Sequence, residues 1–264
     1  MKSYQKFTKL LILLLFFQAL IFSGCNERTS NPSLTAEYQL SGALIADRNH
    51  DSTIVVIDLV KNDSTLTDAD ITFDDDSLVY NALNLSVDFV FSLTNTSLTR
   101  YLSSSRNIAV RDSSNFHDTV TVNVTDTFSI LTIEPPNRLL PGGGPVALSW
   151  NGAANADGYI LAAVLKDEVY TGQGYSAFST SLNTADNIPT LAFTDGINTV
   201  FGWYYIYVYA YTGSPDSILA GEFLPTSLPG QLAANINVAD LQGRFGSLVV
   251  TARDSVYVYA AAAR

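Results

Sequence analysis

The chain has 264 residues and carries 14 Lys and Arg against 25 Asp and Glu, which gives a net charge of −11. Such an acidic chain lacks the clustered basic side chains of nucleic-acid binders, so we expect no nucleic-acid partner. One cysteine cannot form an intrachain disulfide, and with only two histidines it leaves too few ligands for a typical zinc site. Since 47% of the residues are apolar and 11% aromatic, most of the chain is expected to fold around a core.

The first 24 residues are typical of a secretory signal peptide. Three lysines precede a thirteen-residue, almost wholly apolar run at 10–22. A run of this length is short for a membrane-spanning helix and fits the apolar region of a signal peptide. Two small residues, Ser23 and Gly24, then lead to Cys25. The sequence therefore predicts export, with residues 1–24 removed.

The run Phe22-Ser23-Gly24-Cys25 resembles the lipobox of bacterial lipoproteins, although that family usually has Leu where Phe22 stands. The resemblance implies that Cys25 carries the lipid, palmitate included, and that this lipid is the contact with the membrane. The alternative is an ordinary signal peptide in which Cys25 is incidental. Asn rather than Asp follows the cysteine, and the resemblance then implies the outer membrane of the bacterial cell envelope. Residues 25–35 are polar and predict a flexible, lipidated tether.

Residues 36–126 predict a β-sandwich. Short β-branched and aromatic runs alternate with clusters of Asn, Asp, Ser and Gly, with almost no helical periodicity. Strands are expected at 54–60, 69–73, 86–93, 107–110 and 119–124. About six or seven strands in a segment of this length are typical of one sandwich. The segment also loosely resembles the small Ig-like modules of cell-surface proteins.

Residues 127–264 predict a second sandwich. The pattern consists of a tryptophan that ends a strand, a Gly-Tyr pair that opens the next and four alternating residues of a later strand: Trp150, Gly158, Tyr159, Tyr204, Ile206, Val208 and Ala210. This pattern resembles a fibronectin type III domain, which implies that the four alternating residues face the core against the tryptophan. The expected fold class is therefore all-β, with two tandem sandwiches, one Ig-like and one fibronectin type III-like, after a lipoprotein signal peptide.

The second sandwich departs from the fibronectin pattern near its end. About thirty residues, 213–241, stand where that family has a short turn, and we expect them to form an insertion. The segments 246–251 and 256–260 then predict a final hairpin, because both are β-prone and a polar stretch lies between them.

Candidate catalytic and metal-binding residues are few. No phosphate-binding loop, Gly-x-Ser-x-Gly motif or His-Glu-x-x-His motif occurs. His50 and His117 lie in polar segments and are expected to be solvated turn residues rather than parts of a catalytic triad. The densest acidic cluster lacks the calcium-loop spacing, and a hairpin turn explains its last three members better; the cluster consists of Asp68, Asp70, Asp74, Asp75 and Asp76. We therefore expect no enzyme, no metal and no cofactor.

Tyrosine supplies the most informative pattern. If the alternating set that begins at Tyr204 faces the core, the intervening residues face the other way, and the last strand adds two more. The expected face consists of six tyrosines: Tyr205, Tyr207, Tyr209, Tyr211, Tyr257 and Tyr259. Three interpretations remain open: the insertion 213–241 buries this face, a protein partner covers it, or a polysaccharide stacks on it.

The sequence favours a lipid-anchored, exported bacterial protein that acts as a non-catalytic binding or structural module at the cell envelope. The alternative is a carbohydrate-binding accessory lipoprotein that uses the tyrosine face. The two differ in whether that face is open and flat or covered.

Overall fold

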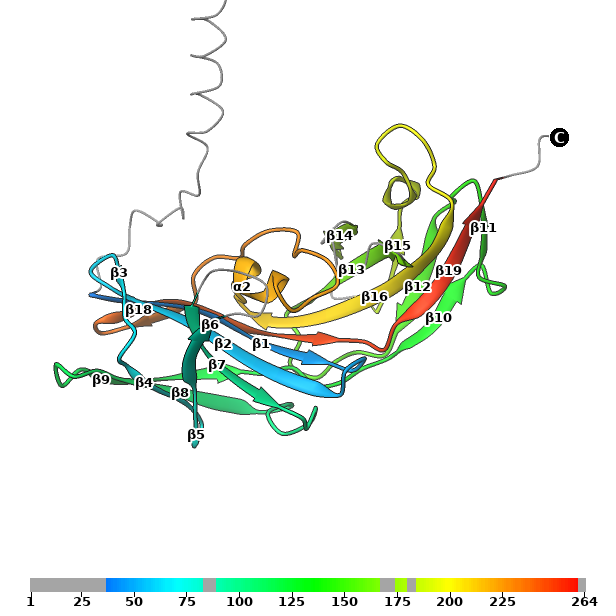
Figure 1. Ribbon diagram of the computed structural model, residues 1–264. Coiled ribbons are helices and arrows are strands. Elements are labelled where there is room, and N and C mark those ends of the chain that lie inside the picture. Colours follow the sequence, from blue (N-terminus) through cyan, green and yellow to red (C-terminus); the bar gives the residue numbers. More distant parts are fainter. Residues whose placement is uncertain (1–36, 83–88, 167–173, 180–183, 261–264) are drawn as a thin grey trace, which may run out of the picture. The chain divides into compact units, whose positions relative to one another are not determined.

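The computed structural model describes residues 37–82, 89–166, 174–179 and 184–260 (Figure 1). The signal peptide, Cys25 and the tether lie outside these residues. The described chain is built of β-strands with two short helical segments, so the all-β fold class is confirmed. Residues 36–264 cluster into one compact unit. No described helix has the length and apolar character needed to cross a bilayer.

A twelve-stranded sheet forms the body of the protein. Eight of its strands follow one another in space in the order β11 (Leu139–Pro141), β19 (Asp254–Tyr259), β16 (Gly202–Gly213), β18 (Leu241–Val250), β1 (Tyr38–Asp47), β2 (Ser52–Lys61), β7 (Phe89–Asn95) and β6 (Val79–Ala82). The other four branch from this path: β13 (Gly158–Leu165) on β16, β14 (Tyr175–Phe178) on β13, β17 (Ile236–Val238) on β18 and β3 (Ser64–Thr65) on β2.

Two smaller sheets complete the β-structure. The four-stranded sheet has the order β5 (Asp76–Ser77), β4 (Asp70–Phe73), β8 (Ser105–Arg111) and β9 (His117–Asn123). The three-stranded sheet has the order β10 (Ile130–Glu134), β12 (Val146–Trp150) and β15 (Ala185–Ile188). Each packs on the large sheet through aromatic rings: Phe73 lies 5.9 Å from Phe245 and Trp150 lies 5.2 Å from Tyr159, measured between ring centroids. The sheets therefore pack face to face, as the sequence predicted.

The core positions of the fibronectin-like pattern are also where the sequence placed them. Tyr204, Ile206, Val208 and Ala210 alternate along β16 and are buried in the same apolar cluster as Trp150. This cluster lies between the large sheet and the two smaller ones.

The expected division into two tandem sandwiches near residue 126 is not confirmed. β1 pairs in parallel with β18 along its whole length, so strands from both sides of residue 126 belong to one sheet. Gly243 permits this pairing, since its φ is +146° and a Cβ there would lie 1.8 Å from the carbonyl oxygen of Leu40. Strand periodicity identifies strands but not such distant partners, and the predicted boundary depended on the strand pattern and on the usual size of a domain.

The predicted final hairpin is wrong. β18 and β19 do not pair with each other; they run one after the other along the same edge of β16. Between Val250 and Asp254 this run has three residues where β16 has two, which is the geometry of a β-bulge. The N–H of Thr251 donates to the carbonyl of Val208, and the N–H of Val208 donates to the Thr251 hydroxyl, both at 3.1 Å. The polar stretch therefore marks a bulge instead of a turn.

The turn between β8 and β9 is fastened to β1 and β2. The Tyr38 hydroxyl donates to the Asp112 carboxylate at 2.6 Å, the Lys61 ammonium donates to the same group at 2.9 Å, and the Tyr38 ring stacks on Phe116. The hydrogen bond from Tyr38, with others, holds the pKa of Asp112 well below its usual range, while hydrogen bonds with Tyr38 and Asp112 raise the pKa of Lys61. These contacts hold the four-stranded sheet against the large one.

The opposite face of the large sheet is covered over part of its area. The segment between β16 and β17 leaves the sheet and forms the one-turn helix α2 (Ser217–Gly221), which lies on the side away from β4, β8 and β9 (Figure 1). Asp216 caps this helix by accepting hydrogen bonds from the N–H groups of Ile218 and Leu219. The second short helix, η2 (Thr190–Phe193), places Phe193 against Tyr204 in the main core.

Candidate functional site

Of the two histidines considered for catalysis, His50 has a structural partner, and His117, expected in a turn, is an exposed residue of β9. His50 lies in an exposed turn, where its Nδ1 is 2.6 Å from an Asp47 carboxylate oxygen. In the acidic cluster, Asp74 pairs with Arg106 and Asp76 with Arg100, so two of its five aspartates join the β4–β5 hairpin to β8 and the segment before it. In the part of the chain that the structure describes, no group of three or more His, Cys, Asp or Glu side chains could hold a metal ion.

The tyrosines of β16 lie on the face of the large sheet opposite Trp150, as predicted. We call Tyr205, Tyr207, Tyr209 and Tyr211 the tyrosine stripe. Tyr207 and Tyr209 stack with ring planes 6° apart and centroids 6.3 Å apart. β19 pairs with the first half of β16, so Tyr257 also lies on this face, opposite Trp203.

The central residues of the tyrosine stripe are covered by the protein's own chain. Tyr209 is fully buried and Tyr207 is 3% exposed, because the segment after β16 folds back over them. Leu219, Ala220 and Leu224 of that segment belong to the same buried cluster as the two rings. Of the three interpretations that the sequence left open, burial by the insertion is therefore the one observed at this part of the stripe.

Polar contacts complete this covering. The hydroxyl groups of Tyr209 and Thr226 are 3.2 Å apart and buried. The covering segment therefore supplies a hydrogen-bonding partner for the buried tyrosine hydroxyl. Burial raises the pKa of Tyr207 to about 12 and raises that of Tyr209 as well. Tyr211 is half-buried, with its ring edge-on to Phe178 of β14.

The first half of β16 has no such cover among the described residues. Trp203 is 46% exposed, Tyr259 is 37% exposed, and Tyr205 and Tyr257 are half-buried. Leu139 of β11 pairs with Tyr257 and is 41% exposed, which extends the patch across three strands. We call Leu139, Trp203, Tyr205, Tyr257 and Tyr259 the aromatic surface. It lies at the end of the large sheet away from α2 (Figure 1).

The bulge between β18 and β19 shapes this surface. An extra residue in one strand reverses the alternation of side chains beyond it. Val256 and Val258 therefore face the main core, and Tyr257 and Tyr259 face outward beside Trp203. The bulge also places the Arg253 guanidinium 4.6 Å above the Tyr205 ring, at the boundary between the covered and open parts of the stripe.

Sequence reasoning identified three of the five residues of this surface and missed Trp203 and Leu139. The signal for Trp203 was present, since it stands two residues before Tyr205 in the same alternation. Leu139 had no such signal, because its place depends on the parallel pairing of β11 with β19.

The aromatic surface is not a flat platform. The rings of Trp203 and Tyr257 are inclined by 45°, with centroids 5.2 Å apart. Leu139 adds an aliphatic side chain beside them, and the Arg253 guanidinium lies over the Tyr205 ring at the edge of the surface. An uneven apolar centre with a charged group beside it is typical of the contact areas of protein interfaces.

No family model and no curated protein matches the chain. Several of the solved structures to which it is similar consist of fibronectin or immunoglobulin modules. The FN1–FN3 domains of chicken CNTN1 give a TM-score of 0.31 at 7% identity, over 84% of this chain and 68% of that one. The fibronectin(III)-like modules of Clostridium thermocellum CbhA give a TM-score of 0.27 at 12% identity, over 84% and 90%. At these TM-scores the likeness assigns the chain to no family and no function.

Proposed function

We propose that this protein is a lipid-anchored, exported bacterial module without catalytic activity, held at the outer membrane by Cys25, and that its aromatic surface docks a protein partner. The observation that carries the proposal is the unequal covering of one sheet face. The protein's own chain buries Tyr207 and Tyr209 under apolar side chains, while the neighbouring Trp203 and Tyr259 are left exposed.

The chemistry of the internal cover indicates the chemistry of the partner. Leucines and an alanine cover the central tyrosines, so a second apolar polypeptide segment is the natural occupant of the continuing surface. The inclined rings of Trp203 and Tyr257 argue against a polysaccharide, because a sugar chain stacks best on rings that share a plane. The carbohydrate-binding alternative therefore becomes an outcome of the test.

The docking proposal is tested by photo-crosslinking in the native envelope. A benzophenone amino acid replaces Trp203 in one strain and Ile197, which is 90% exposed, in a control strain. We expect a discrete protein adduct from position 203 and none from position 197. Tyr257→Ala together with Tyr259→Ala, added to the strain that carries benzophenone at position 203, is expected to abolish that adduct. Polysaccharide adducts from position 203, or a protein adduct that survives the double change, would overturn the proposal.

The anchor is tested separately. Cys25→Ser is expected to prevent acylation and to release the protein from the membrane fraction, because the lipid is the proposed attachment. Mass spectrometry of the mature N-terminus gives the readout. An unmodified Cys25 in the wild-type protein would contradict the anchor without bearing on the aromatic surface.

A further inference from the structure

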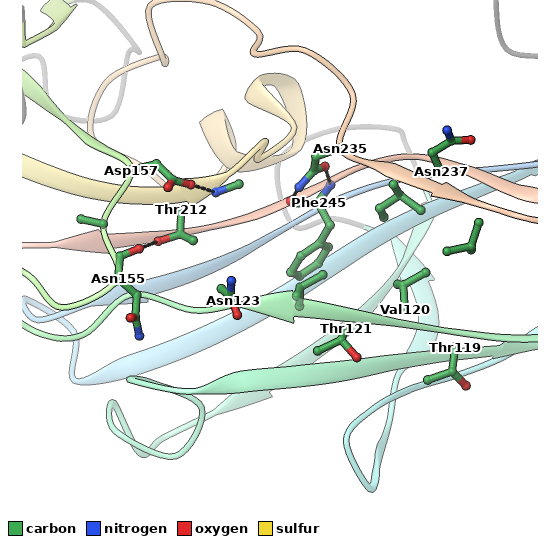
Figure 2. A pocket seen from close by; sticks show the side chains of 15 residues that line it. Thr119, Val120, Thr121, Asn123, Asn155, Asp157, Thr212, Asn235, Asn237 and Phe245 are labelled. Atoms are coloured by element: carbon green, nitrogen blue, oxygen red, sulfur yellow. Dashed lines mark hydrogen bonds between the residues drawn. The ribbon is translucent and has the colours of Figure 1, made fainter.

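An open groove of about 580 Å³ lies between β9 and the β17–β18 hairpin, and none of its lining residues belongs to the aromatic surface. Figure 2 shows Thr119, Thr121 and Asn123 on one side and Asn235 and Asn237 on the other. Its volume is within the range of roughly 300–1,000 Å³ that is usual for ligand sites.

One wall of the groove is an unpaired strand edge. Within the described ranges β9 pairs only with β8, and its pairing partners place the backbone groups of Val120 and Val122 toward β8. The N–H of Val124 donates to the carbonyl of Ser104, which fixes this alternation. In an antiparallel pair the intervening residues direct their N–H and C=O groups to the opposite side. The backbone groups of Thr119, Thr121 and Asn123 therefore point to the free edge of β9, along the groove.

The other wall offers a shorter edge, because β17 has three residues and pairs with β18 alone among the described strands. The Asn235 side-chain amide donates to the Phe245 carbonyl at 2.8 Å, and the Phe245 N–H donates to the Asn235 side-chain oxygen at 3.0 Å. Asn235 thus takes the place of a strand beside β18. The edge of β9 is left as the continuous row of hydrogen-bonding groups that an incoming chain could use.

This edge lacks the features that usually protect exposed strands. Natural edge strands carry Lys, Pro, bulges or inward-pointing charges that prevent pairing with another chain. Thr119 to Asn123 reads Thr-Val-Thr-Val-Asn, with no charge, proline or glycine, and it pairs with β8 without a bulge. The valines face the core and the polar residues face outward.

The charge of the groove limits the partner. Asp157 is the one ionisable side chain among the residues that line it, and its carboxylate accepts a hydrogen bond from the Gly213 N–H at 2.7 Å. Asp118 precedes the lining residues of β9, and no Lys or Arg lines the groove. An incoming segment that carries Lys or Arg would complement this charge.

We propose that the free edge of β9 is a second docking site, which takes an extended segment of a partner protein as an added β-strand. The segment pairs with Thr119, Thr121 and Asn123 through its backbone and places a basic side chain near Asp157. Main-chain hydrogen bonds supply affinity in this mode of recognition, and alternate side chains supply specificity. The site is independent of the aromatic surface.

The test uses the purified full chain and a phage-displayed library of random twelve-residue peptides. We expect enriched peptides that alternate apolar and polar residues and contain Lys or Arg. Thr121→Pro is expected to weaken the best peptide by about tenfold in fluorescence anisotropy, because it removes one outward N–H, while Thr121→Ala keeps the backbone and the affinity. The absence of any enriched peptide, or equal binding by both variants, would overturn the inference.

A second measurement does not depend on the variants. The best peptide is synthesised with N-methyl groups on alternate residues, in two complementary sets. Only one set is expected to lose binding, because only every second N–H of an added strand faces β9. Equal effects of the two sets would overturn strand addition. Loss of peptide binding in Trp203→Ala would place the peptide on the aromatic surface, which would overturn this inference and leave the proposed function standing.

Discussion

Tyr209 and Trp203 lie on the same strand and the same face of the sheet, yet one is fully buried and the other is 46% exposed. Nothing in the local pattern separates them, since both follow the same alternation along β16. The difference comes from the chain after β16, which turns back over the second half of the strand and leaves the first half without a cover among the described residues. Exposure on this face is thus decided by a segment outside the strand, and the open half is where we propose that a protein partner docks.

The two halves of the face also differ in the kind of contact that their aromatic side chains make. Under the cover, the Tyr209 hydroxyl meets the Thr226 hydroxyl, and the covering helix has its own cap in Asp216. In the open half, Trp203 meets Tyr257 by ring contact. The covered half behaves as core, and the open half behaves as a surface.

Truncating one ring from each half tests this comparison most strongly. Tyr209→Ala is expected to lower the free energy of unfolding by about 3–5 kcal/mol, because it removes a fully buried aromatic ring. Trp203→Ala is expected to cost less than about 1 kcal/mol, as is usual for surface positions. Urea denaturation of both variants gives the comparison. Equal losses would show that the two halves are not different environments.

The sequence predicted which side of a strand each side chain faces better than it predicted which strands pair with one another. Period two placed Trp150, Tyr204 and Tyr209 on their correct sides, because side-chain direction is a local property of a strand. The parallel pairing of β1 with β18 could not be predicted in the same way, since it joins segments about two hundred residues apart and leaves no mark on either.

The candidate site shows the same limit. Alternation identified Tyr257 and Tyr259 as outward residues, but it also included Tyr207, whose burial depends on Leu224 and other residues of the insertion. Burial was one of the three interpretations that the sequence left open, and no residue pattern in the sequence decided among them. The fold of the insertion, including its cap at Asp216, decides that outcome.

Removing an apolar side chain from the segment that covers Tyr207 and Tyr209 should make these tyrosines more accessible to solvent, as the residues in the open half of the face are. Leu224→Ala is expected to destabilise the protein by about 2 kcal/mol, at the low end for a buried leucine because the side chain is 8% exposed. It should also increase acrylamide quenching of tyrosine fluorescence. The matched control is Leu191→Ala, since Leu191 is 67% exposed. Identical quenching in the two variants would contradict the covering role of Leu224.

Alkaline titration separates covered tyrosines from free ones. Burial raises the pKa of Tyr207 to about 12, whereas a tyrosine in the unfolded chain ionises near pH 10. The unfolded state therefore loses its proton first, so the stability present below pH 10 falls as the pH rises from about 10 toward 12. Urea midpoints measured at pH 8, 10 and 11 should fall, and less steeply in Tyr207→Phe. An unchanged slope in that variant would contradict the burial of this hydroxyl in solution.

The smallest effect is expected at the boundary between the halves, where Arg253 lies 4.6 Å above the Tyr205 ring. Asn49, in the turn between β1 and β2, helps to hold the backbone of Arg253 in place, because the Arg253 N–H donates to the Asn49 side-chain oxygen at 2.8 Å. Arg253→Ala should cost only about 0.5–1 kcal/mol, the usual contribution of a cation over an exposed ring. Because the Arg253 charge also lowers the pKa of Tyr207, the same variant should shift the ionisation of Tyr207 to higher pH, as followed by absorbance at 295 nm. A loss above about 2 kcal/mol would mean that Arg253 belongs to the cover and that the open half begins beyond it.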